Sequence, residues 1–96
     1  MIADINGIRL AYEECGRGNT LALLLIHGFP LDGRMWRGQV AALSEVAHVI
    51  VPDLRGHGRS EVPPGPYTME QHADDMAALL DHLGVRRAVI GGLSMG

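Results

Sequence analysis

The sequence contains no lysine, a single cysteine and no long run of apolar residues. The lone Cys15 cannot form a disulfide within the chain, so the sequence gives no sign of an oxidising compartment. The longest apolar stretch, Leu21 to Ile26, is far shorter than the roughly 20 residues that a membrane-spanning helix needs. No basic segment precedes an apolar one at the start of the sequence, as a secretion signal would require. We therefore expect a cytoplasmic protein without a membrane partner.

Charge is distributed along the chain without a block of either sign. The acidic residues number 11 against 8 basic ones, all of them arginine, which gives a net charge of −3. Because binding to nucleic acid depends on clustered positive charge, we do not expect a nucleic-acid partner. A hydrophobic share of 47% with 20% charged residues is typical of a globular domain that has an apolar core.

The start of the sequence predicts a β-hairpin. Asn6-Gly7 readily adopts the positive φ angles of a tight turn, with one short strand up to Ile5 and another from Ile8 to Tyr12. Continuous apolar runs, which are typical of strands buried on both faces of a parallel sheet, occur further along. They lie at residues 20–26, 48–51 and 85–91.

Two helices are predicted between these strands. Asp32 is a suitable N-cap for the first. Its apolar residues at helical spacing are Trp36, Val40, Leu43 and Ala47. Thr68 and Gln71 match a capping box for the second helix, which we expect to begin at about Met69 and to end before Gly84.

The second helix has a predicted apolar side and an acidic start. The apolar side carries Met69, Ala73, Met76, Leu80 and Leu83. Negative charge near the positive end of the helix macrodipole comes from Glu70, Asp74 and Asp75. Strands that alternate with helices through short connections predict an α/β fold, in which the hairpin leads into a mainly parallel sheet with crossover helices. Residues 52–66, rich in glycine and proline, are predicted to form a surface loop.

The last five residues match a catalytic motif. Gly92-Leu93-Ser94-Met95-Gly96 has the pattern G-x-S-x-G of a nucleophile elbow. Small residues around the serine let a strand turn sharply, so that the hydroxyl projects at the edge of the sheet. The motif follows a predicted buried strand directly, as an elbow requires, and Ser94 is therefore a candidate nucleophile.

Two further motifs precede the elbow. His27-Gly28-Phe29-Pro30 follows the first buried strand, and Asp53 to Ser60 follows the second. With the elbow, in this order and at this spacing, they resemble the α/β-hydrolase family. The resemblance covers essentially the whole chain. It implies that residues 1–96 are the N-terminal part of a single α/β-hydrolase domain, with the first five of about eight strands. The implied fold is an incomplete α/β-hydrolase fold that ends at the nucleophile elbow.

The resemblance implies roles for three residues. Ser94 is the nucleophile, and the backbone N–H groups of Phe29 and Met95 form the oxyanion hole. The family's acidic residue and its general-base histidine follow the nucleophile, whereas this sequence stops at Gly96. We therefore expect a truncated chain with little turnover by itself, because a serine hydroxyl needs a base to take its proton.

Other polar residues near the motifs allow competing interpretations. His57 could be a base or, with Asp53, a metal ligand. A base before the elbow is out of place for the family, however, and two ligands make a weak metal site, so we expect neither a metal nor a cofactor. Asp53, Arg55 and Ser60 more simply hold their loop through hydrogen bonds and an ion pair, while His27 holds the oxyanion loop. The remaining histidines, for which we predict no special role, are His48, His72 and His82.

The resemblance also limits the substrate class. It is greatest to the esterase, enol-lactonase and cofactor-free haloperoxidase branches, which implies a small-molecule ester, lactone or related carbonyl substrate. Thioesterase and C–C bond hydrolase activities stay open. Ser94 argues against the epoxide-hydrolase and haloalkane-dehalogenase branches, which have an aspartate at this position. The alternative is a non-catalytic remnant or interaction module that pairs with another chain through its open sheet edge. The missing acid and base favour that alternative.

Overall fold

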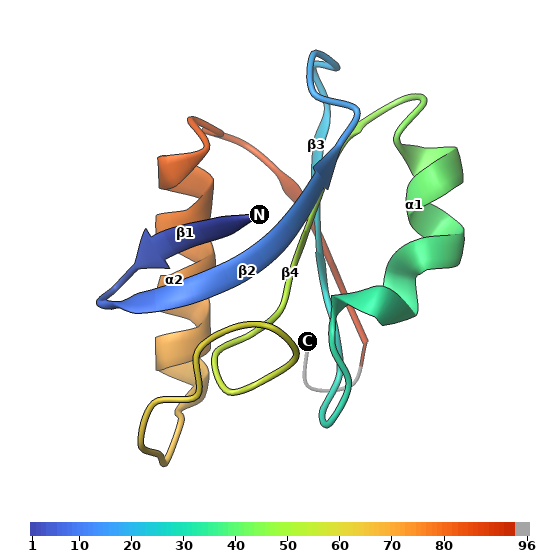
Figure 1. Cartoon of the computed structure of the whole chain (residues 1–96). Coiled ribbons are helices and arrows are strands. Elements are labelled where there is room, and N and C mark those ends of the chain that lie inside the picture. The colour runs from blue at the N-terminus through green and yellow to red at the C-terminus, as the bar shows by residue number, and fades with distance from the viewer. Residues whose placement is uncertain (94–96) are drawn as a thin grey trace.

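A five-stranded sheet with a helix on each face forms the chain, whose computed structural model describes residues 1–93 (Figure 1). The strands are β1 (Ile2–Ile5), β2 (Ile8–Cys15), β3 (Ala22–Ile26), β4 (His48–Pro52) and β5 (Val89–Gly92). The helical segments are a short 3-10 helix η1 (Gly33–Trp36), α1 (Arg37–Leu43) and α2 (Met69–His82). None of the helices that the structure describes has the length and apolar character needed to cross a membrane.

The strands follow the order β1-β2-β4-β3-β5. The predicted hairpin of β1 and β2 is confirmed, with Ile5 opposite Ile8. The end of β2 also pairs antiparallel with β4, from Tyr12 opposite Pro52 to Cys15 opposite Val49, and this pairing extends the strand beyond its predicted end. The parallel part consists of β4, β3 and β5. The α/β fold class is confirmed, and the sheet is mixed.

Two crossover connections place the helices on opposite faces. The chain passes from β3 through α1 to the neighbouring β4, and then from β4 through α2 back across β3 to β5. Because the two crossovers run in opposite directions and parallel crossovers are right-handed, their helices cover opposite faces. Figure 1 shows α1 and α2 on the two sides of the sheet.

Each face of the sheet has an apolar cluster of its own. The cluster beneath α2 is built on Leu10, Leu24, Ile50, Leu54, Met76 and Leu79, with further residues of the hairpin. The cluster beneath α1 contains Leu25, Ala47, Val49 and Val51, with Trp36 and Val40 partly buried against it. Both clusters lie against β3 and β4, which explains the continuous apolar runs of these two strands.

The first predicted helix is shorter than its pattern suggested. The side chain of Asp32 accepts a hydrogen bond from the backbone N–H of Arg34, so it caps η1 rather than α1. Helix α1 then ends at Leu43. Ala47 is buried as predicted, but it reaches the core from the turn after the helix.

The capping box of α2 is confirmed, whereas its buried face is rotated from the predicted one. The Gln71 N–H donates to Thr68 Oγ1 and the Thr68 N–H to Gln71 Oε1, each at 3.0 Å. The buried residues are His72, Asp75, Met76 and Leu79. Most of the predicted apolar side faces a groove instead, because Met69 and Ala73 are exposed.

The last predicted strand is wrong in its start and in its burial. It begins at Val89, because the backbone N–H of Val85 bonds to Leu80 O and still belongs to the end of α2. Val89 and Ile90 are each 54% exposed, since β5 lies at the edge of the sheet.

Candidate active site

The site lies where the parallel strands β3 and β5 end side by side. Ile26, the last residue of β3, is opposite Gly92, the last residue of β5. The backbone N–H of Leu93 donates a hydrogen bond of 3.3 Å to Ile26 O, which continues the pairing past the strand. The loop that begins at His27 and the segment that follows Gly92 therefore start from neighbouring points on the carboxyl edge of the sheet, where α/β proteins bind their ligands.

His27 anchors the loop after β3 from inside the protein. Its side chain is fully buried, and its Nε2 accepts a hydrogen bond of 2.9 Å from the backbone N–H of Leu54. Since that nitrogen is the acceptor, the proton sits on Nδ1, which donates to Gly28 O at 3.0 Å. Burial lowers the pKa of His27, so the neutral form that these bonds require is favoured. The predicted role of His27 in holding this loop is confirmed.

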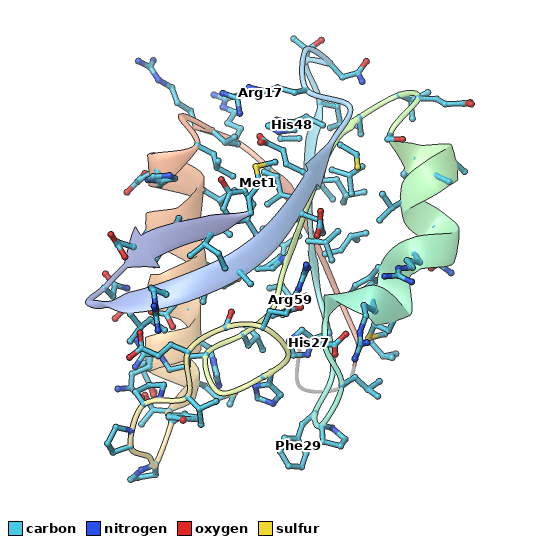
Figure 2. The ribbon with its side chains drawn as sticks, viewed as in Figure 1. Met1, Arg17, His27, Phe29, His48 and Arg59 are labelled. Atoms are coloured by element: carbon cyan, nitrogen blue, oxygen red, sulfur yellow. The ribbon has the colours of Figure 1, made fainter. Side chains whose placement is uncertain are left out.

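Phe29 lies on the exposed side of the same loop. Figure 2 shows His27 inside the molecule and Phe29 at the tip of the loop, pointing away from the sheet. The loop turns back on itself, because the Leu31 N–H donates to Gly28 O at 2.8 Å. The ring of Phe29 meets His57 edge to face, with 5.8 Å between ring centroids. The Phe29 side chain is largely exposed, so it contributes little to the core. The buried His27 therefore positions the backbone of this loop rather than the Phe29 ring.

Asp53 fastens the loop after β4 to the segment that follows the loop after β3. Its Oδ1 accepts the backbone N–H of Gly33 at 2.7 Å, and its Oδ2 accepts the backbone N–H of Arg59 at 3.0 Å. The Ser60 hydroxyl donates to Asp53 O at 2.5 Å and accepts the Ala11 N–H at 2.8 Å. Both carboxylate oxygens of Asp53 therefore hold this loop in place, as the structural interpretation predicted.

Arg55 and Asp75 form a buried ion pair between this loop and α2. Arg55 Nε and Nη2 donate to the two carboxylate oxygens of Asp75 at 2.7 and 2.9 Å. Asn6 Nδ2 adds a third bond to Asp75, at 3.0 Å. The predicted ion pair of the loop therefore exists, but the partner of Arg55 comes from the helix. Asp75 is fully buried, so the negative charge that the sequence placed near the start of the helix is here paired with Arg55.

Three histidines, His27, His57 and His72, form a histidine row, and the Phe29 ring contacts its middle member, His57. The ring of His57 is 5.0 Å from that of His27 and 6.4 Å from that of His72. His57 Nδ1 lies 3.0 Å from Arg55 O, which fixes the ring to its own loop. Within residues 1–93, no group of three or more side chains is placed to hold a metal ion. His57 therefore has a positioning contact within its own loop.

The comparisons with known proteins agree with this geometry. A family model described as alpha/beta hydrolase fold matches residues 22–96. The chain belongs to the α/β-hydrolase fold family. Among its curated relatives, 3-oxoadipate enol-lactonase 2 of Acinetobacter baylyi is 38% identical over 93% of the chain, and epoxide hydrolase A of Mycobacterium tuberculosis is 38% identical over 99%. The chain spans 33% and 30% of their lengths.

Solved structures of α/β hydrolases superpose on nearly all of the chain. The enol-lactonase of Burkholderia xenovorans LB400 matches with a TM-score of 0.95 and 44% identity, over 99% of this chain and 37% of that one. A thermophilic esterase of Thermogutta terrifontis matches with a TM-score of 0.89 and 48% identity, over 99% of this chain and 36% of that one. The chain therefore corresponds to about one third of each of these proteins.

The structure describes one of the three predicted site residues, and the other two lie outside the part that it describes. Phe29 lies on the carboxyl edge of the sheet, next to the strand end that leads to the elbow. Ser94 and Met95 lie outside the described residues. Sequence reasoning missed the buried positions of His72 and Asp75. His72 and Asp75 lie at helical spacing from Met76 and Leu79, which indicates one helix face. A search for apolar residues does not find this face, because two of its four residues are polar.

Proposed function

We propose that this chain carries the nucleophile and the oxyanion loop of an α/β hydrolase that cleaves small esters or lactones through an acyl-enzyme at Ser94. The pairing of Ile26 with Gly92 is the observation that carries the proposal. It starts the loop of Phe29 and the elbow motif from adjacent strand ends. A nucleophile and an oxyanion donor must lie within a few ångströms of one carbonyl group, and this register supports that arrangement.

The proposed chemistry has two steps. Ser94 Oγ attacks the carbonyl carbon while its proton passes to a general base, and the carbonyl oxygen becomes an oxyanion. The N–H groups of Phe29 and Met95 donate to that oxyanion. The intermediate expels the alcohol, which takes the proton from the base, and water then releases the acid by the same route. By the resemblance, the base and its orienting carboxylate belong to a part of the fold beyond this chain.

The substrate class follows from the relatives and from the residue at position 94. Two relatives are named enol-lactonases and one solved relative is named an esterase, which supports a carbonyl substrate. Epoxide hydrolases are similar to a comparable degree, so overall similarity alone does not select the reaction. Serine at the elbow, in place of the aspartate of those branches, favours acyl transfer and an ester or lactone.

A chimeric enzyme tests the proposal. This chain would replace the matching N-terminal part of the Burkholderia xenovorans enol-lactonase, which supplies the rest of the fold. We expect the chimera to hydrolyse 4-nitrophenyl acetate and to react with a fluorophosphonate probe detected by intact mass. Ser94→Ala should abolish labelling and lower kcat at least about a thousandfold. A folded chimera that hydrolyses the ester equally well with Ser94→Ala would refute the proposal.

A further inference from the structure

A polar pocket lies at the amino edge of the parallel strands, at the end of the sheet opposite to the candidate active site. Strands β3 and β4 begin there, with Ala22 opposite His48. Figure 2 shows Arg17 and His48 at this end of the molecule, whereas Phe29 lies at the other end. The volume of the pocket, about 510 Å³, is typical of small-molecule sites. Its lining includes Arg17, His48, Leu83, Val85, Arg86 and Arg87.

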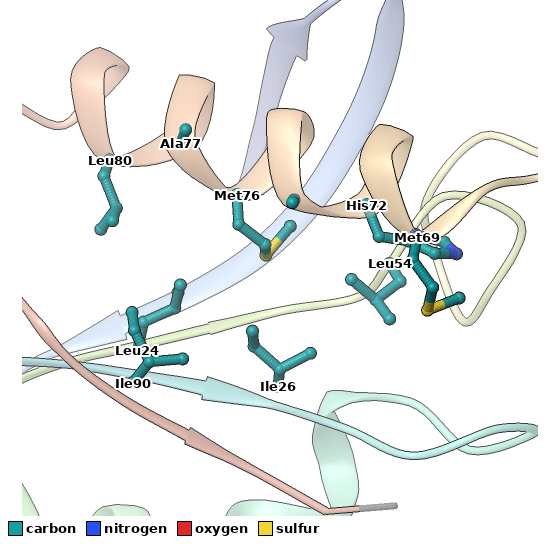
Figure 3. A pocket seen from close by; sticks show the side chains of 10 residues that line it. Leu24, Ile26, Leu54, Met69, His72, Met76, Ala77, Leu80 and Ile90 are labelled. Carbon is teal, nitrogen blue, oxygen red and sulfur yellow. The ribbon is translucent and has the colours of Figure 1, made fainter. Parts of the chain in front are cut away.

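This pocket differs in character from the apolar groove beside α2. Figure 3 shows that groove, whose lining includes Leu24, Met76 and Ile90 and contains no carboxylate or guanidinium group. The pocket at the amino edge is lined by three arginines instead. The positive charge is a local feature, because the chain as a whole has a net charge of −3. The pocket is therefore suited to an anion, and the groove is not.

Two of the three arginines in the pocket have no carboxylate partner. The chain has 8 arginines, and all of them lie within the described residues. Within residues 1–93 the arginines that form ion pairs are Arg9, Arg17, Arg34, Arg55 and Arg59. Arg37, Arg86 and Arg87 form none in this part of the chain, and the last two of these line the pocket. Their guanidinium donors are therefore available to a ligand.

The third arginine, Arg17, is held at the wall of the pocket by Glu14. Arg17 Nη1 donates to Glu14 Oε2 at 2.6 Å, and His48 Nε2 lies 2.6 Å from the same oxygen. The Glu14 side chain is only 7% exposed, whereas that of Arg17 is 64% exposed. Within the described residues, Nε and Nη2 of Arg17 make no hydrogen bond. Glu14 therefore fixes one side of the guanidinium group and leaves the other side to face a ligand.

The charged groups around the pocket leave an excess of positive charge. Among the described residues, Glu14 is the only carboxylate bonded to a side chain of the lining. Asp81 lines a neighbouring hollow with Arg86, but the two form no ion pair within residues 1–93. Three arginines against Glu14 leave an excess of two positive charges, or of one when Asp81 is counted as well.

The end of α2 opposes an anion only weakly. The C-terminal end of a helix carries roughly half a negative charge, which comes from carbonyl groups without partners. Here the Val85 N–H donates to Leu80 O at 2.9 Å, and the Gly84 N–H donates to Asp81 O at 3.1 Å. Two of the last carbonyl groups are therefore already paired. The charge of the helix end is smaller than the excess that the arginines supply.

We propose that the pocket at the amino edge binds a small organic phosphate. The phosphate group lies between Arg17, Arg86 and Arg87, and the organic part packs against Leu83 and Val85, which are partly buried apolar residues of the lining. A phosphate monoester carries about −1.5 to −2 charges at pH 7 and has three acceptor oxygens, so it matches both the excess charge and the flat guanidinium donors.

Titration of the chain with phenyl phosphate tests the proposal. By isothermal titration calorimetry we expect one-to-one binding with a Kd below about 1 mM. Inorganic phosphate lacks the apolar part and should bind about fivefold more weakly. Benzoate has the ring but a single charge, and it should also bind at least about fivefold more weakly. In amide NMR spectra, phenyl phosphate should shift the signals of residues 83–87 and leave those of the loop around Phe29 in place.

Three variants locate the contact. Arg86→Gln and Arg87→Gln each remove one guanidinium group from an exposed position, so the chain should stay folded. Each should weaken the binding of phenyl phosphate at least about fivefold, because a charge-assisted contact is lost. Arg37→Gln is the matched control, since Arg37 is exposed and forms no ion pair within residues 1–93 but lies on α1, outside the pocket. It should leave the Kd unchanged. Circular dichroism confirms that each variant is folded.

Several results would overturn the proposal. One is a folded chain that shows no saturable binding of phenyl phosphate up to about 10 mM. Another is equal weakening by Arg37→Gln and Arg86→Gln, which would mean a diffuse attraction by surface charge. A third is benzoate binding as tight as that of phenyl phosphate, and a fourth is NMR shifts confined to the loop around Phe29. The pocket shares no residue with the proposed chemistry, so Ser94→Ala should leave the Kd unchanged.

Discussion

The backbone N–H of Leu54 donates a hydrogen bond of 2.9 Å to Nε2 of His27, and this bond joins the loop after β4 to the loop after β3. Strands β3 and β4 are parallel neighbours, but strand pairing does not join the loops that follow them. A buried imidazole is suited to join them, because one ring nitrogen accepts while the other donates. The position of the proposed oxyanion loop therefore depends on the protonation state of one side chain.

Replacing His27 should cost stability. His27→Phe fills a similar space but leaves the buried Leu54 N–H without a partner, and we expect the free energy of unfolding to fall by about 1–3 kcal/mol. Urea unfolding followed by circular dichroism measures this change. His82→Phe is the control, because His82 is exposed at the end of α2, and it should change stability by less than about 0.5 kcal/mol. Equal losses in the two variants would contradict the anchoring role of His27.

Stability should also fall in mild acid. Burial is the main cause that lowers the pKa values of His27 and His72 in the folded chain, and the nearby His57 lowers both further. As the pH falls below about 6.5, the unfolded chain then binds more protons than the folded one, so the free energy of unfolding decreases. Above about pH 7 these histidines are neutral in both states and contribute no slope.

The contribution of the histidines to the pH dependence of stability can be separated from that of the nearby carboxylates. Of the acidic groups that face it, Asp32 has its pKa lowered to about 2 by the Arg34 side chain, so it stays ionised in this range. The other facing charges are Asp53, Arg55 and Asp75. His72→Phe should reduce the pH slope, whereas His82→Phe should not. Urea midpoints between pH 5 and 8 supply the measurement, and an unchanged slope in His72→Phe would argue against its part in the effect.

The Arg55–Asp75 pair should behave as a coupled unit. Asp75→Leu leaves a largely buried guanidinium unpaired and should cost about 3–5 kcal/mol of unfolding free energy. The double variant Arg55→Leu with Asp75→Leu should cost clearly less than the sum of the single variants. A double-mutant cycle from urea unfolding measures the coupling. The exposed pair of Arg59 and Glu13 is the control, and Glu13→Gln should cost at most about 1 kcal/mol.

Local signals in the sequence predicted the elements well, and tertiary partners explain the differences. The hairpin turn at Asn6-Gly7 and the capping box at Thr68 depend on neighbouring residues only, and both are confirmed. The burial of Asp75 depends on Arg55, 20 residues away, and no periodic pattern contains that information. The start of β5 was wrong because the end of α2 holds Val85.

In the candidate site as well, the sequence predicted the motifs, whereas their contacts with distant segments were seen only in the structure. The motif around Phe29 predicted an oxyanion loop held by His27, and the structure adds the partner of His27, which is the backbone N–H of Leu54. The motif from Asp53 to Ser60 indicated hydrogen bonding within one loop. The structure shows bonds from that loop to β2, to η1 and to α2, which join segments that the sequence separates widely. The motif therefore binds three elements together, which a reading of its own residues could not reveal.

The loop after β4 should be intolerant of a side chain at Gly58. Gly58 has a φ of +51°, and a Cβ there would meet the carboxylate of Asp53. Gly58→Ala should displace that carboxylate from the Gly33 and Arg59 N–H groups and lower the free energy of unfolding by about 1–3 kcal/mol. Gly38→Ala is the matched control, because Gly38 lies inside α1 with open space around it, and it should stabilise the chain by about 0.5–1 kcal/mol. A tolerated Gly58→Ala would show that Asp53 does not hold the loop.

The oxyanion role proposed for Phe29 belongs to its backbone, and this allows a side-chain test. The Phe29 ring is 68% exposed, so Phe29→Ala in the chimera should change the free energy of unfolding by less than about 0.5 kcal/mol and leave kcat within about threefold of the parent. His27→Phe keeps residue 29 unchanged but releases the loop, and it should lower kcat by about tenfold to a hundredfold with a smaller change in KM, since an oxyanion donor acts mainly in the transition state. The two variants are compared by steady-state hydrolysis of 4-nitrophenyl acetate at pH 8, where His27 is neutral because burial lowers its pKa. A large loss of kcat in Phe29→Ala together with full activity in His27→Phe would mean that the ring, and not the anchored N–H, makes the contact that matters.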